Sequence, residues 1–251
     1  MVKMNNPWDL RIDDTREIDN LYTFLIFCVD ETSEYEYFKF FETDKIKINI
    51  FQNQKNSIDN VVKAITYCNN NGIIDCDNNV IDGFEIWCVY DRDTFIDDPN
   101  FEETKTKFNI ASSTADLHKI NLAWSNDSFE LWVLLHLTEI TELNDYLHRD
   151  NYYEFLENYF KSKENKNERL ELILSHSTFT YKRDMKKRKN FIEVVRNEIL
   201  PYTEIAIERS KNLVSIHSHK EDLTNWCPCT LVHNLVERLL NKGRKELPIL
   251  K

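Results

Sequence analysis

Two apolar runs, each followed at once by acidic residues, constrain the fold of this chain more than any other feature. Residues 84–90 are apolar almost without a break, and residues 21–29 form a similar run. Such continuous runs are typical of strands buried on both faces of a parallel sheet, whereas half-exposed strands alternate between apolar and polar residues. The sequence therefore predicts an α/β fold with a mostly parallel sheet.

The segments between these runs alternate as a parallel sheet requires. After the first strand, the pattern indicates a short helix, a more exposed strand and an amphipathic helix behind Ser57, which is the predicted N-cap. This alternation of strands with crossover helices gives a parallel sheet flanked by helices. Beyond residues 84–90 we expect a further helix, a short strand and a buried helix. The predicted elements are residues 21–29, 35–41, 45–51, 57–69, 84–90, 101–107, 120–124 and 129–137.

From residue 151 onward the pattern is helical and the charge changes sign. Residues 1–150 contain 13 basic and 29 acidic side chains, whereas residues 151–251 contain 19 basic and 14 acidic ones. We therefore expect an α/β domain at residues 1–150 and a basic helical part at residues 151–251 that packs on it as a C-terminal helical subdomain. The helices of this part are predicted, without strands between them, at residues 152–160, 170–174, 185–200, 203–212 and 231–240.

The acids that follow the two apolar runs are the first candidates for chemistry. Asp91 and Asp93 directly follow one predicted strand, and Glu31 and Glu34 follow the other. Ligands of open α/β sheets bind outside the carboxyl ends of the strands, and the period of two predicts that Asp91 and Asp93 point the same way. Carboxylates from separate loops suffice to hold Mg²⁺ or Mn²⁺. We expect Asp91, Asp93 and Glu31 as metal ligands, with Glu34 assisting; the alternative is that all are solvated loop acids.

Three further polar residues accompany the predicted buried helix at 129–137. Asn126 and Glu130 have an equally good interpretation as helix-capping residues and as residues that order a metal site or substrate. His136 lies among leucines, where a hydrogen-bonded core histidine is the more common case. We nevertheless keep Glu130 and His136 as catalytic candidates and Asn126 as a substrate-binding candidate.

The net charge of −11 argues against nucleic-acid binding, but the distribution of charge weakens that argument. Residues 181–196 contain seven basic and two acidic side chains, the most basic stretch of the chain. A solvated basic helix would explain this stretch as well as a polyanion-binding surface would. The candidate substrate-binding residues there are Lys182, Arg183, Lys186, Lys187 and Arg188.

Other sequence features limit the classes of protein to consider. The six cysteines follow no metal-ligand spacing, and no P-loop or G-x-G-x-x-G motif is present. No apolar run is long enough to span a bilayer, and the first seven residues lack the apolar segment of a signal peptide. We expect a cytoplasmic protein that does not bind membranes.

Four blocks in the expected order resemble the RloB-like proteins of bacterial phage defence, a family of Toprim-fold nucleases. Residues 27–38 resemble the block after the first strand, and residues 87–93 resemble the block that ends in D-x-D. Residues 123–136 resemble a serine-asparagine-proline block followed by phenylalanine-glutamate-leucine-tryptophan, and residues 228–236 resemble the closing proline-x-threonine-x-valine-histidine block. The resemblance extends over roughly residues 22–240.

The resemblance implies a Toprim-like sheet and a metal-dependent nuclease that acts in anti-phage defence and abortive infection. It favours RNA, transfer RNA among the candidates, over DNA, and it implies an ABC- or AAA-type ATPase as partner; a homodimer is also expected. One departure affects the site: Val29 stands where the family has a glutamate, so Asp30, Glu31 or Glu34 would have to supply that acid. Asp127 also replaces the proline of the third block.

Two other functions remain open. The chain would be a non-catalytic or regulatory subunit that acts through the ATPase if the missing glutamate is not replaced. It would be a nucleotide-binding or nucleotidyl-transfer enzyme if the same acids serve a nucleotide instead.

Overall fold

A five-stranded sheet forms the centre of the molecule. The computed structural model describes residues 21–93 and 98–249. The strand order is β2-β1-β3-β4-β5; the first four strands in this order are mutually parallel, and β5 pairs antiparallel with β4. The predicted α/β class with a mostly parallel sheet is confirmed. The strands are β1 (Tyr22–Cys28), β2 (Ile46–Phe51), β3 (Phe84–Asp91), β4 (Asn121–Asn126) and β5 (Cys229–Thr230).

The two apolar runs form the neighbouring central strands β1 and β3. Phe24 to Cys28 and Ile86 to Tyr90 are buried, and Cys28 lies beside Val89 in the parallel register. Helices cover both faces of these strands, so water reaches neither face and the polar alternation of a half-exposed strand is absent.

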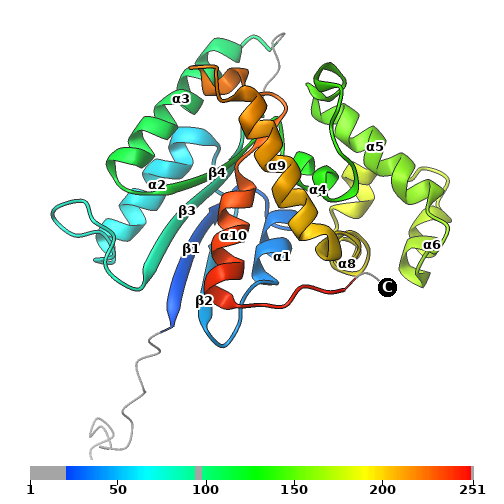
Figure 1. Ribbon diagram of the computed structural model, residues 1–251, viewed down its shortest axis with the longest axis horizontal. Coiled ribbons are helices and arrows are strands. Elements are labelled where there is room, and N and C mark those ends of the chain that lie inside the picture. Colours follow the sequence, from blue (N-terminus) through cyan, green and yellow to red (C-terminus); the bar gives the residue numbers. More distant parts are fainter. Residues whose placement is uncertain (1–20, 94–97, 250–251) are drawn as a thin grey trace, which may run out of the picture.

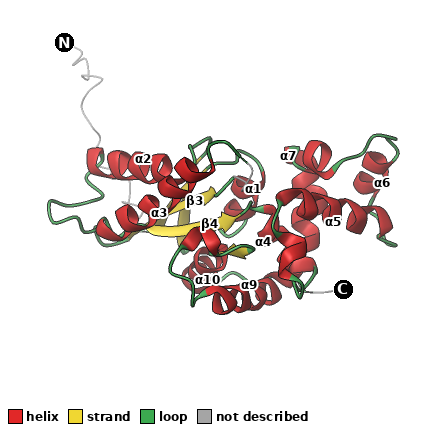
Figure 2. Cartoon of the chain, turned by 90° about the horizontal axis from the view of Figure 1, so that it is seen from above, coloured by secondary structure: helices red, strands yellow, loops and turns green. Residues whose placement is uncertain are grey.

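Helices lie on both sides of the sheet, as Figures 1 and 2 show. Helices α2 (Ser57–Asn70) and α3 (Phe101–Leu117) pack together on one face, and α9 (Thr203–His217) and α10 (Val232–Gly243) lie on the other. Two shorter helices follow strand ends, namely α1 (Ser33–Lys39) after β1 and α4 (Glu130–Leu137) after β4; α4 packs against α9.

A group of helices lies at one end of the sheet core (Figure 2), formed by α5 (Arg149–Ser162), α6 (Glu168–Leu174) and the segment that follows. That segment is a series of short turns rather than one helix: π-helical Tyr181–Met185, α7 (Arg188–Asn190), π-helical Phe191–Arg196, α8 (Asn197–Ile199) and 3₁₀-helical Leu200–Tyr202. Two more 3₁₀ turns, Leu143–Tyr146 and Leu223–Asn225, lie in loops.

Four local predictions were wrong. Strand β5 was not expected, because two residues are too short to show a period. Helix α3 extends ten residues beyond the predicted Lys107, since its polar later turns conceal the helical pattern. The N-cap of α2 is Asn56, and Ser57 is its first helical residue. The helix predicted from Met185 is interrupted, because Lys187 has an extended backbone (ψ 132°).

The domain boundary at residue 150 stays a prediction, although α9, α10 and β5 from the C-terminal part pack on the sheet. Residues 1–20 and 94–97 of the predicted first domain lie outside the described residues. Within the described ranges, no helix is both long and apolar enough to cross a membrane.

Candidate functional site

Acids gather at the carboxyl ends of β1, β3 and β4. Asp30 and Glu34 follow β1, Asp91 is the last residue of β3, and Glu130 begins α4 after β4. We call these four residues the acid cluster. Because β1, β3 and β4 are neighbours in a parallel sheet, their carboxyl ends meet at one edge, where α/β proteins bind ligands.

The loop after β1 is folded around its own carboxylates. Asp30 Oδ1 accepts hydrogen bonds from the backbone N–H groups of Thr32 (2.5 Å) and Ser33 (2.6 Å). The Glu34 carboxylate in turn accepts from the Asp30 N–H at 3.0 Å. These reciprocal bonds start α1 and fix Glu34 in its first turn, where only 1% of the residue is exposed.

Lys186 is the cation of the acid cluster. Its Nζ lies 2.7 Å from Glu130 Oε1 and 3.3 Å from Asp30 Oδ2. Burial alone would raise the pKa of Glu130, but the Lys186 ammonium outweighs burial and lowers it. Burial would likewise lower the pKa of Lys186, yet the Glu130 and Asp30 carboxylates raise it. Asp30, Glu130 and Lys186 therefore form an ion-pair network in which Glu130 is buried and the other two side chains are half-buried.

Glu34 and Asp91 are not compensated in this way. Burial and the neighbouring Asp30 raise the pKa of Glu34 well above its usual value. Burial, Glu34 and Glu130 raise the pKa of Asp91 in the same direction. Asp91 Oδ1 is shielded from solvent and accepts no hydrogen bond. Lys186 offsets only part of this effect at Glu34, and Arg149 only part of it at Asp91, so neither carboxyl group is fully compensated.

A second ion-pair network lies beside the acid cluster and is centred on Arg149. Arg149 donates to Asp127 through Nε (3.1 Å) and Nη2 (3.2 Å), and it also pairs with Asp93. Asp127 is fully buried and follows a cis Asn126–Asp127 peptide bond. Asn56 donates to Asp93 at 3.3 Å and accepts from the Asp91 N–H at 3.3 Å.

The backbone separates the roles of Asp91 and Asp93. Strand β3 ends at Asp91, and Asp93 has a left-handed conformation (φ 57°), so the period of two does not extend to Asp93. Asp91 belongs to the acid cluster, whereas Asp93 is an exposed member of the Arg149 network.

Two predicted catalytic candidates make other contacts. Glu31 is exposed, and its carboxylate accepts from Asn53 Nδ2 at 3.2 Å. His136 is buried between Tyr37, whose hydroxyl is 3.1 Å from Nε2, and the Trp132 carbonyl, 2.8 Å from Nδ1. Burial lowers the pKa of His136 to about 3, so its imidazole is neutral. No contact found among the described residues joins Glu31 or His136 to the acid cluster.

The predicted substrate-binding residues are distributed over several places. Asn126 is fully buried; its Nδ2 donates to the Thr224 carbonyl at 3.1 Å and its Oδ1 has no partner. Of the five basic candidates, Lys186 reaches the acid cluster. The others pair elsewhere: Arg183 and Lys187 with Asp184, Arg188 with Glu36 at 2.5 Å, and Lys182 over the Tyr153 ring.

Sequence reasoning missed Arg149 and Asn56, and it gave Lys186 no special place among five basic residues. No local pattern distinguishes Arg149, which lies more than 50 residues from the D-x-D motif that it contacts. The only available signal was the excess of acids, since several buried carboxylates require cations from elsewhere in the chain.

The acid cluster offers few free ligands to the expected divalent metal ion. In residues 21–93 and 98–249, no group of three or more His, Cys, Asp or Glu side chains is arranged to hold a metal. Glu34 and Asp91 fit best, because both are uncompensated and Asp91 Oδ1 lacks a donor. Mg²⁺ is often held by one or two carboxylates and several waters. The residues therefore fit one ion, not the two that a larger set of free carboxylates would hold.

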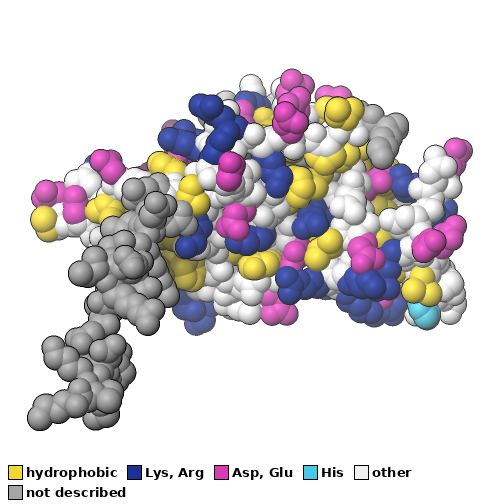
Figure 3. All heavy atoms as spheres, turned by 90° about the horizontal axis from the view of Figure 1, so that it is seen from below, with side chains coloured by type: hydrophobic (Ala, Val, Ile, Leu, Met, Phe, Trp, Pro, Cys, Tyr) yellow, Lys and Arg dark blue, Asp and Glu magenta, His cyan; other side chains and the backbone are white. Residues whose placement is uncertain are grey.

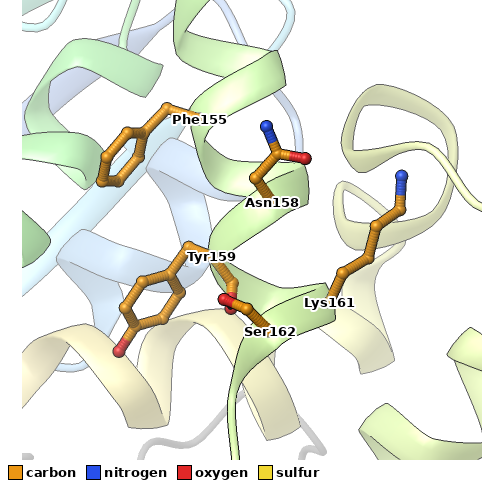
Figure 4. Close-up of a pocket in the computed structure, with 5 residues that line it drawn as sticks. All are labelled: Phe155, Asn158, Tyr159, Lys161 and Ser162. Carbon is orange, nitrogen blue, oxygen red and sulfur yellow. The ribbon is translucent and has the colours of Figure 1, made fainter.

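Two other parts of the surface differ from this site. A shallow hollow on α5 is lined by residues of that helix alone, with Phe155 and Tyr159 pointing away from Lys161 (Figure 4). It contains none of the candidate acids. The end of the molecule opposite the acid cluster shows basic and acidic side chains intermixed rather than one patch of either sign (Figure 3).

Comparisons with known proteins agree with the blocks recognised in the sequence. A search of the curated proteins and a search of the solved structures found no match. A family model described as RloB-like protein matches residues 24–239, which include every strand end that contributes to the acid cluster.

Proposed function

The chain belongs to the RloB-like protein family, and we propose that it hydrolyses phosphodiester bonds of nucleic acid at the acid cluster with Mg²⁺ or Mn²⁺. RNA, including transfer RNA, is the proposed substrate class in preference to DNA, because the resemblance to phage-defence nucleases favours it. The proposal includes a role in anti-phage defence together with a partner ATPase.

One observation carries the proposal. Glu34 is buried and Asp91 is half-buried, the pKa values of both carboxyl groups are raised, and the shielded Asp91 Oδ1 has no hydrogen-bond donor. A cluster of this kind is costly to fold and is stabilised when a cation joins it. Groups with strongly perturbed pKa values in a ligand-binding crevice are typical of functional sites.

The acids and the lysine of the site would have different roles in cleavage. Glu34 and Asp91 would hold the divalent ion, which when bound polarises the phosphate and lowers the pKa of a bound water. Lys186 holds Glu130 in its charged form and in a fixed position. The Lys186 ammonium also adds positive charge beside the place where a phosphate would lie.

Cleavage assays test the proposal directly. We expect the purified chain to cut RNA in Mg²⁺ or Mn²⁺ and not in EDTA. Asp91→Asn and Glu34→Gln should each lower the rate at least about a hundredfold, the order expected when a group that acts in the transition state is removed. Glu103→Gln removes an exposed carboxylate paired with Lys107 and should cleave like the wild type. Absence of cleavage of both RNA and DNA, or cleavage unaffected by Asp91→Asn, would contradict the proposal.

A second function is favoured by a different observation. Val29 packs against the core where a Toprim glutamate is expected, and Lys186 and Arg149 already neutralise several nearby acids. These features suit a regulatory subunit that acts through the ATPase. This function predicts that the chain co-purifies with an ATPase and that phage defence survives Asp91→Asn. Loss of defence in Asp91→Asn, with the ATPase still bound, would exclude it.

A further inference from the structure

A pocket of about 640 Å³ lies next to the acid cluster and differs from it in charge. It is bounded by the segment after β3, the start of α3, the Leu143–Tyr146 turn, the end of α9 and the Leu223–Asn225 turn. The residues that matter most are Arg92, Phe101, Leu143, Leu147 and Lys220. We call it the cationic pocket.

No aspartate or glutamate is among the residues that line the cationic pocket, although the chain as a whole has a net charge of −11. Two of the lining residues, Arg92 and Lys220, are basic. Neither forms an ion pair with a carboxylate in the part of the chain that the structure describes. The pocket therefore concentrates positive charge beside a site rich in negative charge, which favours an anionic ligand.

Arg92 has an unused donor inside the fold. The residue is 7% exposed, and its Nη1 donates to the Thr224 carbonyl at 3.1 Å. Its Nε–H is shielded from solvent and has no acceptor. Leaving a buried charged donor without an acceptor costs free energy. The Arg92 Nε–H is therefore available to a ligand.

Lys220 also retains a donor. Its Nζ donates to the Asn225 carbonyl at 2.9 Å and lies 3.0 Å from His217 Nδ1. His217 Nε2 lies 3.1 Å from the Pro228 carbonyl and donates to it, so Nδ1 is the accepting nitrogen and the imidazole is neutral. An ammonium has three N–H donors, and two are accounted for.

Apolar side chains line one part of the pocket, and polar residues such as Asn144, His148 and Asn225 complete it. Phe101 lies at the start of α3, and Leu143 and Leu147 face it from the segment before α5. An anion-binding end combined with an apolar wall matches a phosphate joined to a flat aromatic group. The planar guanidinium of Arg92 suits phosphate oxygens, and an aromatic ring accepts a base of any sequence by stacking.

The cationic pocket and the acid cluster share a wall. Arg92 lies between Asp91 and Asp93 in the chain. Arg92 Nη1 and Asn126 Nδ2 both donate to the same Thr224 carbonyl. The pocket therefore adjoins the end of β3 that contributes Asp91 to the acid cluster.

We propose that the cationic pocket binds one nucleotide unit, with its phosphate on Arg92 and Lys220 and its base against Phe101, Leu143 and Leu147. Binding itself follows from the pocket alone. That the nucleotide belongs to the nucleic acid being cleaved rests on the proposed function.

Calorimetric titration of the full chain with AMP in EDTA tests the proposal without metal or cleavage. AMP should bind at least tenfold more tightly than adenosine and than inorganic phosphate. Lys220→Met and Arg92→Met should each weaken AMP at least tenfold. Lys107→Met, which changes an exposed lysine elsewhere on α3, should bind AMP like the wild type. Because Arg92 is buried and its variant is at risk of unfolding, Lys220→Met is the deciding variant.

Three results would overturn the proposal: no binding of AMP at millimolar concentration, equal binding of AMP and inorganic phosphate, or unchanged AMP binding in Lys220→Met. Asp91→Asn separates this proposal from the proposed function, because it should abolish cleavage while leaving AMP binding intact. A wild-type chain that cleaves RNA but does not bind AMP would refute the pocket alone. A chain that binds AMP but never cleaves would refute the nuclease alone.

Discussion

The acid cluster and the cationic pocket are neighbours that handle buried charge in opposite ways. In the acid cluster, Lys186 neutralises Asp30 and Glu130, so the chain supplies much of the compensating charge itself. In the cationic pocket, Arg92 and Lys220 form no ion pair with a carboxylate among the described residues, and no acid lines the pocket. Buried charge that the fold compensates contributes to structure, whereas buried charge left uncompensated marks a place for a ligand. Glu34 and Asp91 show that the acid cluster contains both kinds.

Removing Lys186 should have the largest effect on stability, because Lys186 pairs with both Asp30 and the buried Glu130. Lys186→Met leaves Glu130 buried and unpaired, so we expect a loss of about 3–5 kcal/mol in the free energy of unfolding, measured by urea denaturation. Adding Glu130→Gln should restore much of the loss. Lys189→Met, at an exposed pair with Glu193, should change stability by less than about 1 kcal/mol. Equal effects of Lys186→Met and Lys189→Met would show that Lys186 has no special role.

Metal binding should give the next largest change in stability. It should also show whether Asp91 or Glu31 is a metal ligand. If one ion joins Glu34 and Asp91, Mg²⁺ or Mn²⁺ at a hundred times its dissociation constant should stabilise the chain by about 2.7 kcal/mol in a thermal unfolding assay. Asp91→Asn should lose this gain and Glu31→Gln should keep it. A gain that disappears in Glu31→Gln would make exposed Glu31 a ligand after all.

The dependence of stability on pH should reveal the uncompensated pair. The pKa values of Glu34 and Asp91 are raised in the folded chain, so the stability they contribute is full below their unfolded pKa values near 4 and is lost as the pH rises through the folded values. A pKa that is higher by one in the folded chain than in the unfolded chain corresponds to about 1.4 kcal/mol. Asp91→Asn should therefore exceed the wild type in stability by an amount that grows between pH 5 and pH 8. An advantage that shrinks with rising pH would contradict the assigned direction.

The smallest loss of stability is expected in the cationic pocket. Lys220→Met removes a cation that balances no carboxylate, so only hydrogen bonds to Asn225 and His217 are lost. We expect a decrease of about 1 kcal/mol in the free energy of unfolding, the usual size for such bonds. A loss as large as that of Lys186→Met would show that the cationic pocket is a structural network rather than a ligand site.

The sequence predicted the helices and strands whose residue pattern depends only on their own burial. The continuous apolar runs identify β1 and β3, helical patterns identify α2 and α5, and an apolar run behind capping residues identifies α4. These patterns reflect the burial of each segment's own residues. Strand β5 and the interruptions of the segment at residues 181–202 are not visible in the hydrophobic pattern of the sequence. Each depends on a partner far away: β5 pairs with β4, and Lys186, within the interrupted segment, reaches across to Glu130.

The sequence by itself determined which acids stand at the ends of the strands, since a parallel sheet brings those ends to one edge. Only the tertiary structure decided which acids remain uncompensated. Arg149 begins α5 and Lys186 lies in the turn after the π-helical Tyr181–Met185, and their positions depend on how these segments pack beyond β4. Because the energy of a buried charge depends on what surrounds it and not on its place in the chain, Glu34 and Asp91 became distinguishable from Glu130 and Asp93 only after folding.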